Sequence, residues 1–184
     1  MKEWFYIGID PGLSGACIAL NQDGEIAGSL ALPHYADMPC YRKHKTRSVL
    51  DVDILDKWFS AFPDIRMIVV EESPPFKMGT VGAYTSGFNN GQLQLCVKRL
   101  MKLHDRSDSF VTVSAANWQR RICSGYGISE PWSKEVSISS AISLYEDFPL
   151  FTKPKKTADG FSDAAHIARY GMLLSLQRDE QRRN

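Results

Sequence analysis

The chain has 184 residues, which is enough for one domain with a substantial hydrophobic core and too few for two full domains. It is 43% hydrophobic and 23% charged, without an apolar run of roughly 18 residues or a secretory signal, so we expect a cytoplasmic protein without a membrane span. A net charge of +1 does not by itself indicate nucleic-acid binding.

The cysteines exclude two further classes of protein. They are widely spaced and form no Cys-x-x-Cys pair, which argues against a disulfide framework and against a tetrahedral zinc site. We expect reduced thiols with structural roles at all four positions, which are Cys17, Cys40, Cys96 and Cys123.

The N-terminal part of the chain predicts a three-stranded antiparallel meander. Apolar stretches at 4–10, 16–21 and 25–32 are typical of strands, and Gln22-Asp23-Gly24 gives the Asp-Gly signal of a tight hairpin. Residues 33–47 are polar and basic and lack periodicity, so we expect an exposed loop there.

A helix and a buried strand follow. Residues 51–62 have helical periodicity, with Asp51 or Asp53 as the N-cap and Pro63 as the stop. Residues 65–71 are apolar almost without interruption, which is typical of a strand covered on both faces by helices. Together these segments predict an α/β sheet.

The rest of the chain is mainly helical. A helix begins near Gly82, and its glycines at 82, 87 and 91 indicate that something there needs close backbone approach. We expect one domain over 1–177 and a charged, frayed tail over 178–184. The other predicted elements are a strand at 110–113 and helices at 115–122, 133–146 and 159–177.

Acidic residues stand where a sheet would bring three segments together. Asp10 ends the first strand, and Glu71 and Glu72 end the buried strand, where only one of the two can face Asp10. Asp159 and Asp163 lie one turn apart on one face of the last helix. Each acid alone could instead be a turn residue, a solvated strand end or a helix cap.

Taken together, the acids indicate a metal-binding site. Carboxylates held within a few ångströms repel one another, so a fold tolerates such a cluster only with cations among them. Oxygen ligands favour Mg²⁺ or Mn²⁺, and two such ions are a known device for phosphodiester hydrolysis. The sequence therefore predicts a two-metal site.

Several motifs carry a family resemblance. GIDPGLSGA at 8–16, VVEE at 69–72, the glycine-interrupted helix after it and KKTADGFSDAAHIARYG at 155–171 resemble the RuvC family of Holliday-junction resolvases, most closely its phage-type members. The order of elements agrees to about residue 175. The first motif is shared with actin-like ATPases, whereas the last is much more specific.

The resemblance implies a ribonuclease-H-like α/β fold, with a mixed five-stranded sheet whose first three strands are antiparallel, flanked by helices. It implies a homodimer that cuts four-way DNA junctions symmetrically by Mg²⁺-dependent hydrolysis, in DNA recombination and repair in a bacterium or a phage-infected cell. No small-molecule cofactor is expected. The implied catalytic residues, which would also hold two Mg²⁺ or Mn²⁺ ions, are Asp10, Glu71, Asp159 and Asp163.

The positions of further residues relative to the four acids suggest additional roles. Many family members space the last two acids three apart, which would place one on Gly160, whereas this chain offers Asp159. His166 lies one turn beyond Asp163 and is a candidate for an outer-shell or phosphate contact, with a structural role as the alternative. The candidates for DNA contacts are Phe76, as a wedge in the junction or a core residue, Lys77, Lys134, Lys155 and Lys156.

Three alternative functions remain open from the sequence. The same acids would serve a ribonuclease-H-like nuclease that cuts other branched DNA or RNA-DNA hybrids. An actin-like nucleotide-binding protein would use the loop at 12–15, but a second Asp-x-Gly loop is missing from the middle of the chain. A catalytically inactive junction-binding protein would not need all four acids.

Overall fold

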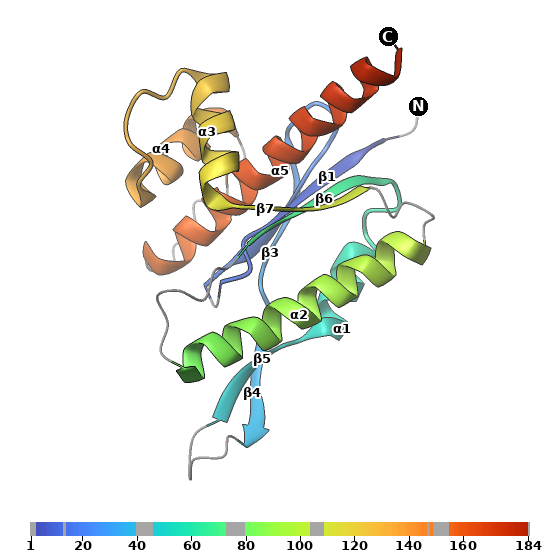
Figure 1. Cartoon of the computed structure of the whole chain (residues 1–184), viewed down its shortest axis with the longest axis vertical. Helices are drawn as coiled ribbons and strands as arrows, with labels where there is room; N and C mark the ends of the chain where they lie inside the picture. Colours follow the sequence, from blue (N-terminus) through green and yellow to red (C-terminus); the bar gives the residue numbers. More distant parts are fainter. Residues whose placement is uncertain are drawn as a thin grey trace.

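The computed structural model shows a central sheet between two layers of helices (Figure 1). The strand order of the sheet is β3-β2-β1-β6-β7. In the ranges described, no helix has both the length and the apolar character needed to cross a membrane. The described residues are 3–12, 14–39, 46–72, 80–103, 109–146, 148 and 155–183, without the side chains of 36–39, 46, 47, 80, 81, 103 and 155–157.

The strands form the mixed sheet that was expected. β1 (Phe5–Ile9) pairs antiparallel with β2 (Ala16–Leu20), which pairs antiparallel with β3 (Ile26–Ala31). On its other side β1 lies parallel to β6 (Ile65–Glu71), and β7 (Phe110–Val113) lies parallel to β6. The predicted fold class, with its antiparallel N-terminal meander, is therefore confirmed.

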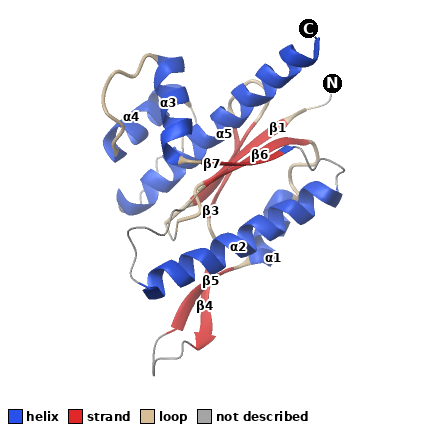
Figure 2. Cartoon of the chain, in the orientation of Figure 1, coloured by secondary structure: helices blue, strands red, loops and turns tan. Residues whose placement is uncertain are grey.

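Helices cover both faces of this sheet (Figure 2). α1 (Val52–Phe59) and α2 (Thr80–Leu103) pack on one face. α3 (Ala115–Tyr126), α4 (Lys134–Leu144) and α5 (Lys155–Arg183) pack on the other. The strands β1 and β2 are buried along their whole length, because side chains on both of their faces are covered.

The prediction of a loop at 33–47 is wrong for 34–39 and 46–47, which form strands, and 40–45 lie outside the described residues. β4 (His34–Pro39) and β5 (Thr46–Leu50) pair antiparallel as a separate two-stranded sheet next to α2. The buried Asn89 of α2 holds this hairpin, since its Oδ1 accepts from the Leu50 N–H at 3.3 Å. The pairing depends on this contact with a distant helix, which local periodicity does not reveal.

The prediction of a frayed C-terminal tail at 178–184 is corrected as well. α5 continues to Arg183, and Asp179 in its last turns forms an ion pair with Arg66 of β6. Arg66 also donates from Nε to the Ser175 hydroxyl at 3.0 Å. These contacts attach the end of the helix to the sheet.

Backbone contact brings α5 unusually close to the sheet. A Cβ atom at Gly8 would overlap the Ala164 carbonyl oxygen and the Ala168 backbone. A Cβ atom at Gly160 would overlap the Ser14 carbonyl oxygen, with the Gly15 Cα also within 3.0 Å. Glycines therefore let the start of α5 lie directly on β1 and on the turn that follows it.

The glycines of α2 do not show the same close packing. A Cβ atom at Gly87 or Gly91 would meet no atom within 4 Å. At Gly87 and Gly91 the predicted close backbone approach is therefore not made by any described residue.

Candidate active site

Two of the predicted acids leave the sheet at the same edge. Ile9 pairs with Val70 in the parallel ladder between β1 and β6. The next residues, Asp10 and Glu71, therefore lie at the carboxyl ends of adjacent parallel strands.

The other two acids reach this edge from α5. Burial raises the pKa of Asp10, and the neighbouring charge of Asp159 adds to the rise. Burial likewise raises the pKa of Glu71 to about 7, with further contributions from the charges of Asp10 and Asp163. The charges of Asp10, Glu71 and Asp163 thus act on one another, and the charge of Asp159 acts on Asp10 and Asp163.

Asp10 is held by the turn that follows β1. The Gly12 N–H donates to Asp10 Oδ1 at 3.0 Å, which lowers the pKa of the carboxyl against the larger effect of burial. Gly15 N–H closes the turn by donating to the Gly12 carbonyl oxygen at 2.9 Å. The turn therefore fixes one oxygen of Asp10.

Glu71 rather than Glu72 points toward Asp10. The Trp118 indole N–H donates to Glu71 Oε2 at 2.8 Å. Glu72 is exposed, and its carboxylate accepts from the Thr112 hydroxyl at 3.4 Å. The alternation of side chains along a strand separates the two glutamates, as the sequence predicts.

Asp163 and Asp159 have different partners. Ser137 of α4 donates its hydroxyl to Asp163 Oδ1 at 2.5 Å, and burial raises the pKa of Asp163 to about 6. The Lys134 ammonium donates to Asp159 Oδ2. Asp159 is 8% exposed, and its other oxygen, Oδ1, is buried without a hydrogen-bond partner among the described residues.

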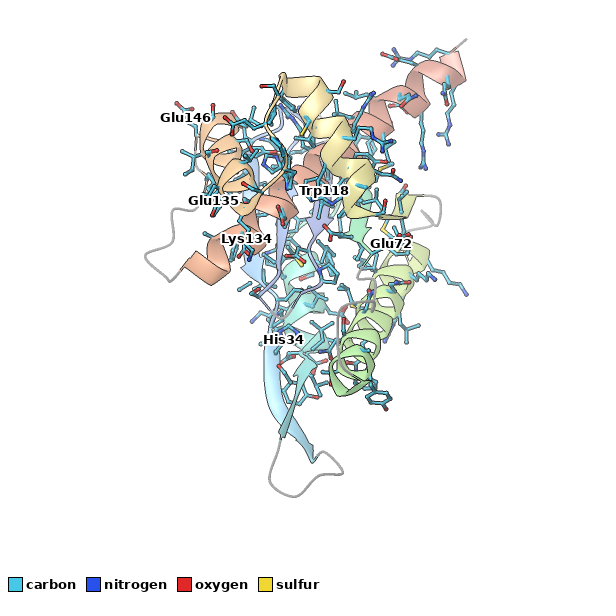
Figure 3. The ribbon with its side chains drawn as sticks, turned by 60° about the vertical axis from the view of Figure 1, so that its left-hand side comes forward. His34, Glu72, Trp118, Lys134, Glu135 and Glu146 are labelled. Atoms are coloured by element: carbon cyan, nitrogen blue, oxygen red, sulfur yellow. The ribbon has the colours of Figure 1, made fainter. Side chains whose placement is uncertain are left out.

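Lys134 therefore faces an acid of the site. We expected it to contact phosphate, but its ammonium pairs with Asp159, which raises the pKa of Lys134. Its side chain is 72% exposed and extends from the start of α4 (Figure 3). It supplies the positive charge that partly balances the carboxylates.

His166 touches none of the four acids through a described hydrogen bond. It is fully buried, with Nε2 at 2.9 Å from the Ser140 hydroxyl and 3.1 Å from the Ser137 carbonyl oxygen. Burial lowers the pKa of His166 to about 4, so the ring is neutral near pH 7. These surroundings favour the structural alternative over a direct phosphate contact.

Four predicted DNA contacts have no described side chain. Phe76 and Lys77 lie outside the described residues. Lys155 and Lys156 belong to the first turn of α5, but their side chains are outside the described part of the structure. Their roles stay predictions.

Sequence analysis missed Trp118 and Ser137. Both are buried, and each donates a hydrogen bond to one acid of the site. Their only local signal is a polar or amphipathic side chain on the inner face of a helix, which many structural residues share. Their role becomes visible only when the helices are packed on the sheet.

The residues present fit hard divalent cations by their chemistry. All four donors are carboxylates, and the unpartnered Asp159 Oδ1 is a buried oxygen that a cation would satisfy. As they stand, no three His, Cys, Asp or Glu side chains in the described ranges are grouped closely enough to hold a metal ion. The Lys134 ammonium lies against Asp159 in this arrangement, so a bound ion would compete with it.

Comparison with known proteins identifies the fold. No protein-family model matches the chain, and no curated protein matches it. The solved structure of T. thermophilus RuvC in complex with Holliday junction substrate superposes with a TM-score of 0.57 at 14% identity, covering 95% of this chain and 98% of that chain. A second Thermus thermophilus RuvC structure covers the same shares at 12% identity, with a TM-score of 0.46. The first of these two comparisons shows that the chain has a RuvC-like fold.

Proposed function

We propose that this protein is a metal-dependent endodeoxyribonuclease that resolves four-way DNA junctions by paired, symmetric phosphodiester hydrolysis, in DNA recombination and repair. The observation that supports the proposal is that Asp10 and Glu71 end adjacent parallel strands, where the charges of Asp159 and Asp163 on α5 act on them. The RuvC-like fold adds support, because one solved protein with this fold is bound to a Holliday junction substrate.

The four acids would hold two Mg²⁺ ions, with Mn²⁺ as a substitute. Such ions supply activation of the attacking water and stabilisation of the leaving oxygen when bound. The protein contributes orientation: Gly12 holds Asp10, and the other acids are held by donors on α3 and α4. Burial of the carboxylates excludes water and strengthens their attraction for cations.

Symmetric cutting of two strands requires two active sites, so we propose a homodimer. α2 supports this assembly with an exposed stripe in which Leu95 is 70% and Tyr84 57% exposed. Gly87 and Gly91 lie between them with open space above their Cα atoms, which would let a second helix approach closely. A second copy packed on this face of α2 would cover both exposed side chains.

The activity is tested with a labelled four-way junction, Mg²⁺ and the Asp10→Asn variant. We expect paired nicks from the wild-type protein and a fall of at least about 100-fold in cleavage by Asp10→Asn, because an amide is a much weaker ligand than a carboxylate. Junction binding should be retained in a gel-shift assay with Ca²⁺. A variant that cleaves at the wild-type rate would exclude Asp10 from the site.

Other substrates provide the controls. Flaps, linear duplexes and RNA-DNA hybrids with the same sequence should be cut much more slowly than the junction. Faster cleavage of a hybrid or a flap would assign the same acids to another ribonuclease-H-like nuclease. Binding without cleavage of any substrate would indicate an inactive junction-binding protein.

A further inference from the structure

A buried layer behind the acids connects Glu71 with Asp163. Trp118 Nε1 donates to Glu71 Oε2 at 2.8 Å, and the Ser137 hydroxyl donates to Asp163 Oδ1 at 2.5 Å. Trp118 is fully buried and Ser137 is 1% exposed. Each acid thus has a neutral donor that fixes one of its oxygens from inside the protein.

His166 joins these two donors. Its ring stacks on the Trp118 ring, with centroids 6.4 Å apart and planes 15° from parallel. Its Nε2 lies 3.1 Å from the carbonyl oxygen of Ser137. A shift of this buried ring would therefore displace both donors, although they come from different helices.

Other rings hold the histidine in place. The Trp132 ring lies edge-on to it at 5.2 Å between centroids, and the Tyr145 ring lies 6.2 Å away. The Ser140 hydroxyl is 2.9 Å from His166 Nε2. With neighbours on several sides, the buried imidazole ring has little freedom to rotate.

We infer that Trp118 and Ser137 are positioning residues, held by His166, which fix Glu71 and Asp163 in the orientation that binds the metal ions. The inference rests on the proposed function, since it assigns these donors a purpose in that site. Donors behind metal-binding side chains typically change metal affinity or activity about 10- to 100-fold when they are removed.

The Trp118→Phe variant tests the first donor. It keeps an aromatic ring over His166 but removes the indole N–H. We expect a fall of about 10- to 100-fold in the cleavage rate at saturating junction, a higher Mg²⁺ requirement and junction binding within about twofold of wild type. Trp58→Phe removes an indole from α1, on the opposite face of the sheet, and should stay close to wild type.

The Ser137→Ala variant tests the second donor. We expect the same loss of rate and rise in Mg²⁺ requirement, whereas Ser139→Ala, on the exposed side of α4, should have no effect. Wild-type cleavage by both Trp118→Phe and Ser137→Ala would overturn the inference. Equal losses of cleavage rate in these variants and in their control variants would also overturn it.

A measurement without cleavage separates the inference from the proposed function. The four tryptophans give four indole N–H signals in a ¹H-¹⁵N spectrum. The Trp118 signal is the one that disappears in Trp118→Phe. If that variant does not fold, the other three tryptophans are replaced one at a time, and the signal that none of these replacements removes belongs to Trp118. We expect the Trp118 signal to move most on adding Mg²⁺ and in Glu71→Gln. A signal that stays in place in both cases overturns the inference even if the protein cuts junctions. A signal that moves while junctions stay uncut supports the positioning role and rejects the proposed substrate.

Discussion

At the scale of single residues, the candidate site brings together carboxylates that destabilise one another. Burial raises the pKa values of Asp10, Glu71 and Asp163, which shows that their ionised forms are costly in the absence of cations. Among the described residues, Lys134 is the cation that hydrogen-bonds to this group. The structure therefore supports a role for Lys134 in balancing the charge of the carboxylates, rather than a role in DNA binding.

Replacement of Lys134 by glutamine should make the protein more dependent on Mg²⁺. We expect Lys134→Gln to lower the free energy of unfolding in EDTA by up to about 1 kcal/mol, since the pair is largely exposed and screened by solvent. Mg²⁺ should then raise the melting temperature of the variant more than that of the wild type. Scanning calorimetry with and without Mg²⁺ checks this.

Lys57→Gln is the matched control for this prediction. Lys57 is an exposed lysine in the last turn of α1, on the other face of the sheet from α4. It should leave the effect of Mg²⁺ unchanged. An equal response to Mg²⁺ in Lys134→Gln and wild type would mean that Lys134 and the metal do not compete for Asp159.

At the scale of elements, the position of α5 on the sheet decides whether the acids meet. Gly8 and Gly160 allow backbone-to-backbone contact, which places Asp159 and Asp163 beside the end of β1. A helix that packed through larger side chains would stand farther from the sheet and carry its acids away from Asp10. The glycines are therefore as important for the site as the acids.

The Gly8→Ala variant tests this packing. We expect it to destabilise the protein by about 1–3 kcal/mol, because the added methyl group would overlap backbone atoms that cannot rotate away. Gly125→Ala, in α3 with open space around it, should change stability by less than about 1 kcal/mol and in the stabilising direction. Urea unfolding of both variants measures the difference, and a neutral Gly8→Ala would contradict the described packing.

At the scale of the whole molecule, the raised pKa values link stability to pH. Glu71 and Asp163, with pKa values of about 7 and about 6, bind protons in the folded state at pH values where the unfolded chain has released them. Stability without metal should therefore fall as pH rises from about 4.5 to 7. The lowered pKa of His166, about 4, makes stability rise with pH up to about pH 6.5. This single group does not cancel the combined effect of Glu71 and Asp163.

We therefore expect the metal-free protein to melt at a higher temperature at pH 5 than at pH 7.5. Mg²⁺ should reverse this order, because ions bind the ionised carboxylates and stabilise the folded state more as pH rises. The Glu71→Gln/Asp163→Asn double variant should lose most of both effects. A melting temperature that rises from pH 5 to pH 7.5 in EDTA would contradict the proposed cost of ionisation.

The central strands could be predicted from the amino-acid order alone. Uninterrupted apolar runs mark β1 and β6, and strand alternation indicates that only one of Glu71 and Glu72 can face Asp10, because both signals come from neighbouring residues. The choice of Glu71 came from the family resemblance. The RuvC-like fold was also expected from local motifs at Asp10 and Asp163.

The surroundings of those acids depend on how the helices pack on the sheet. Trp118 is 47 residues from Glu71, Ser137 is 26 residues from Asp163, and Asn89 is 39 residues from its partner in β5. Contacts at such separations leave no periodic trace in the sequence, since they depend on how helices pack rather than on what lies next along the chain. Local chemistry thus specified the carboxylates, and packing selected the donors that orient them.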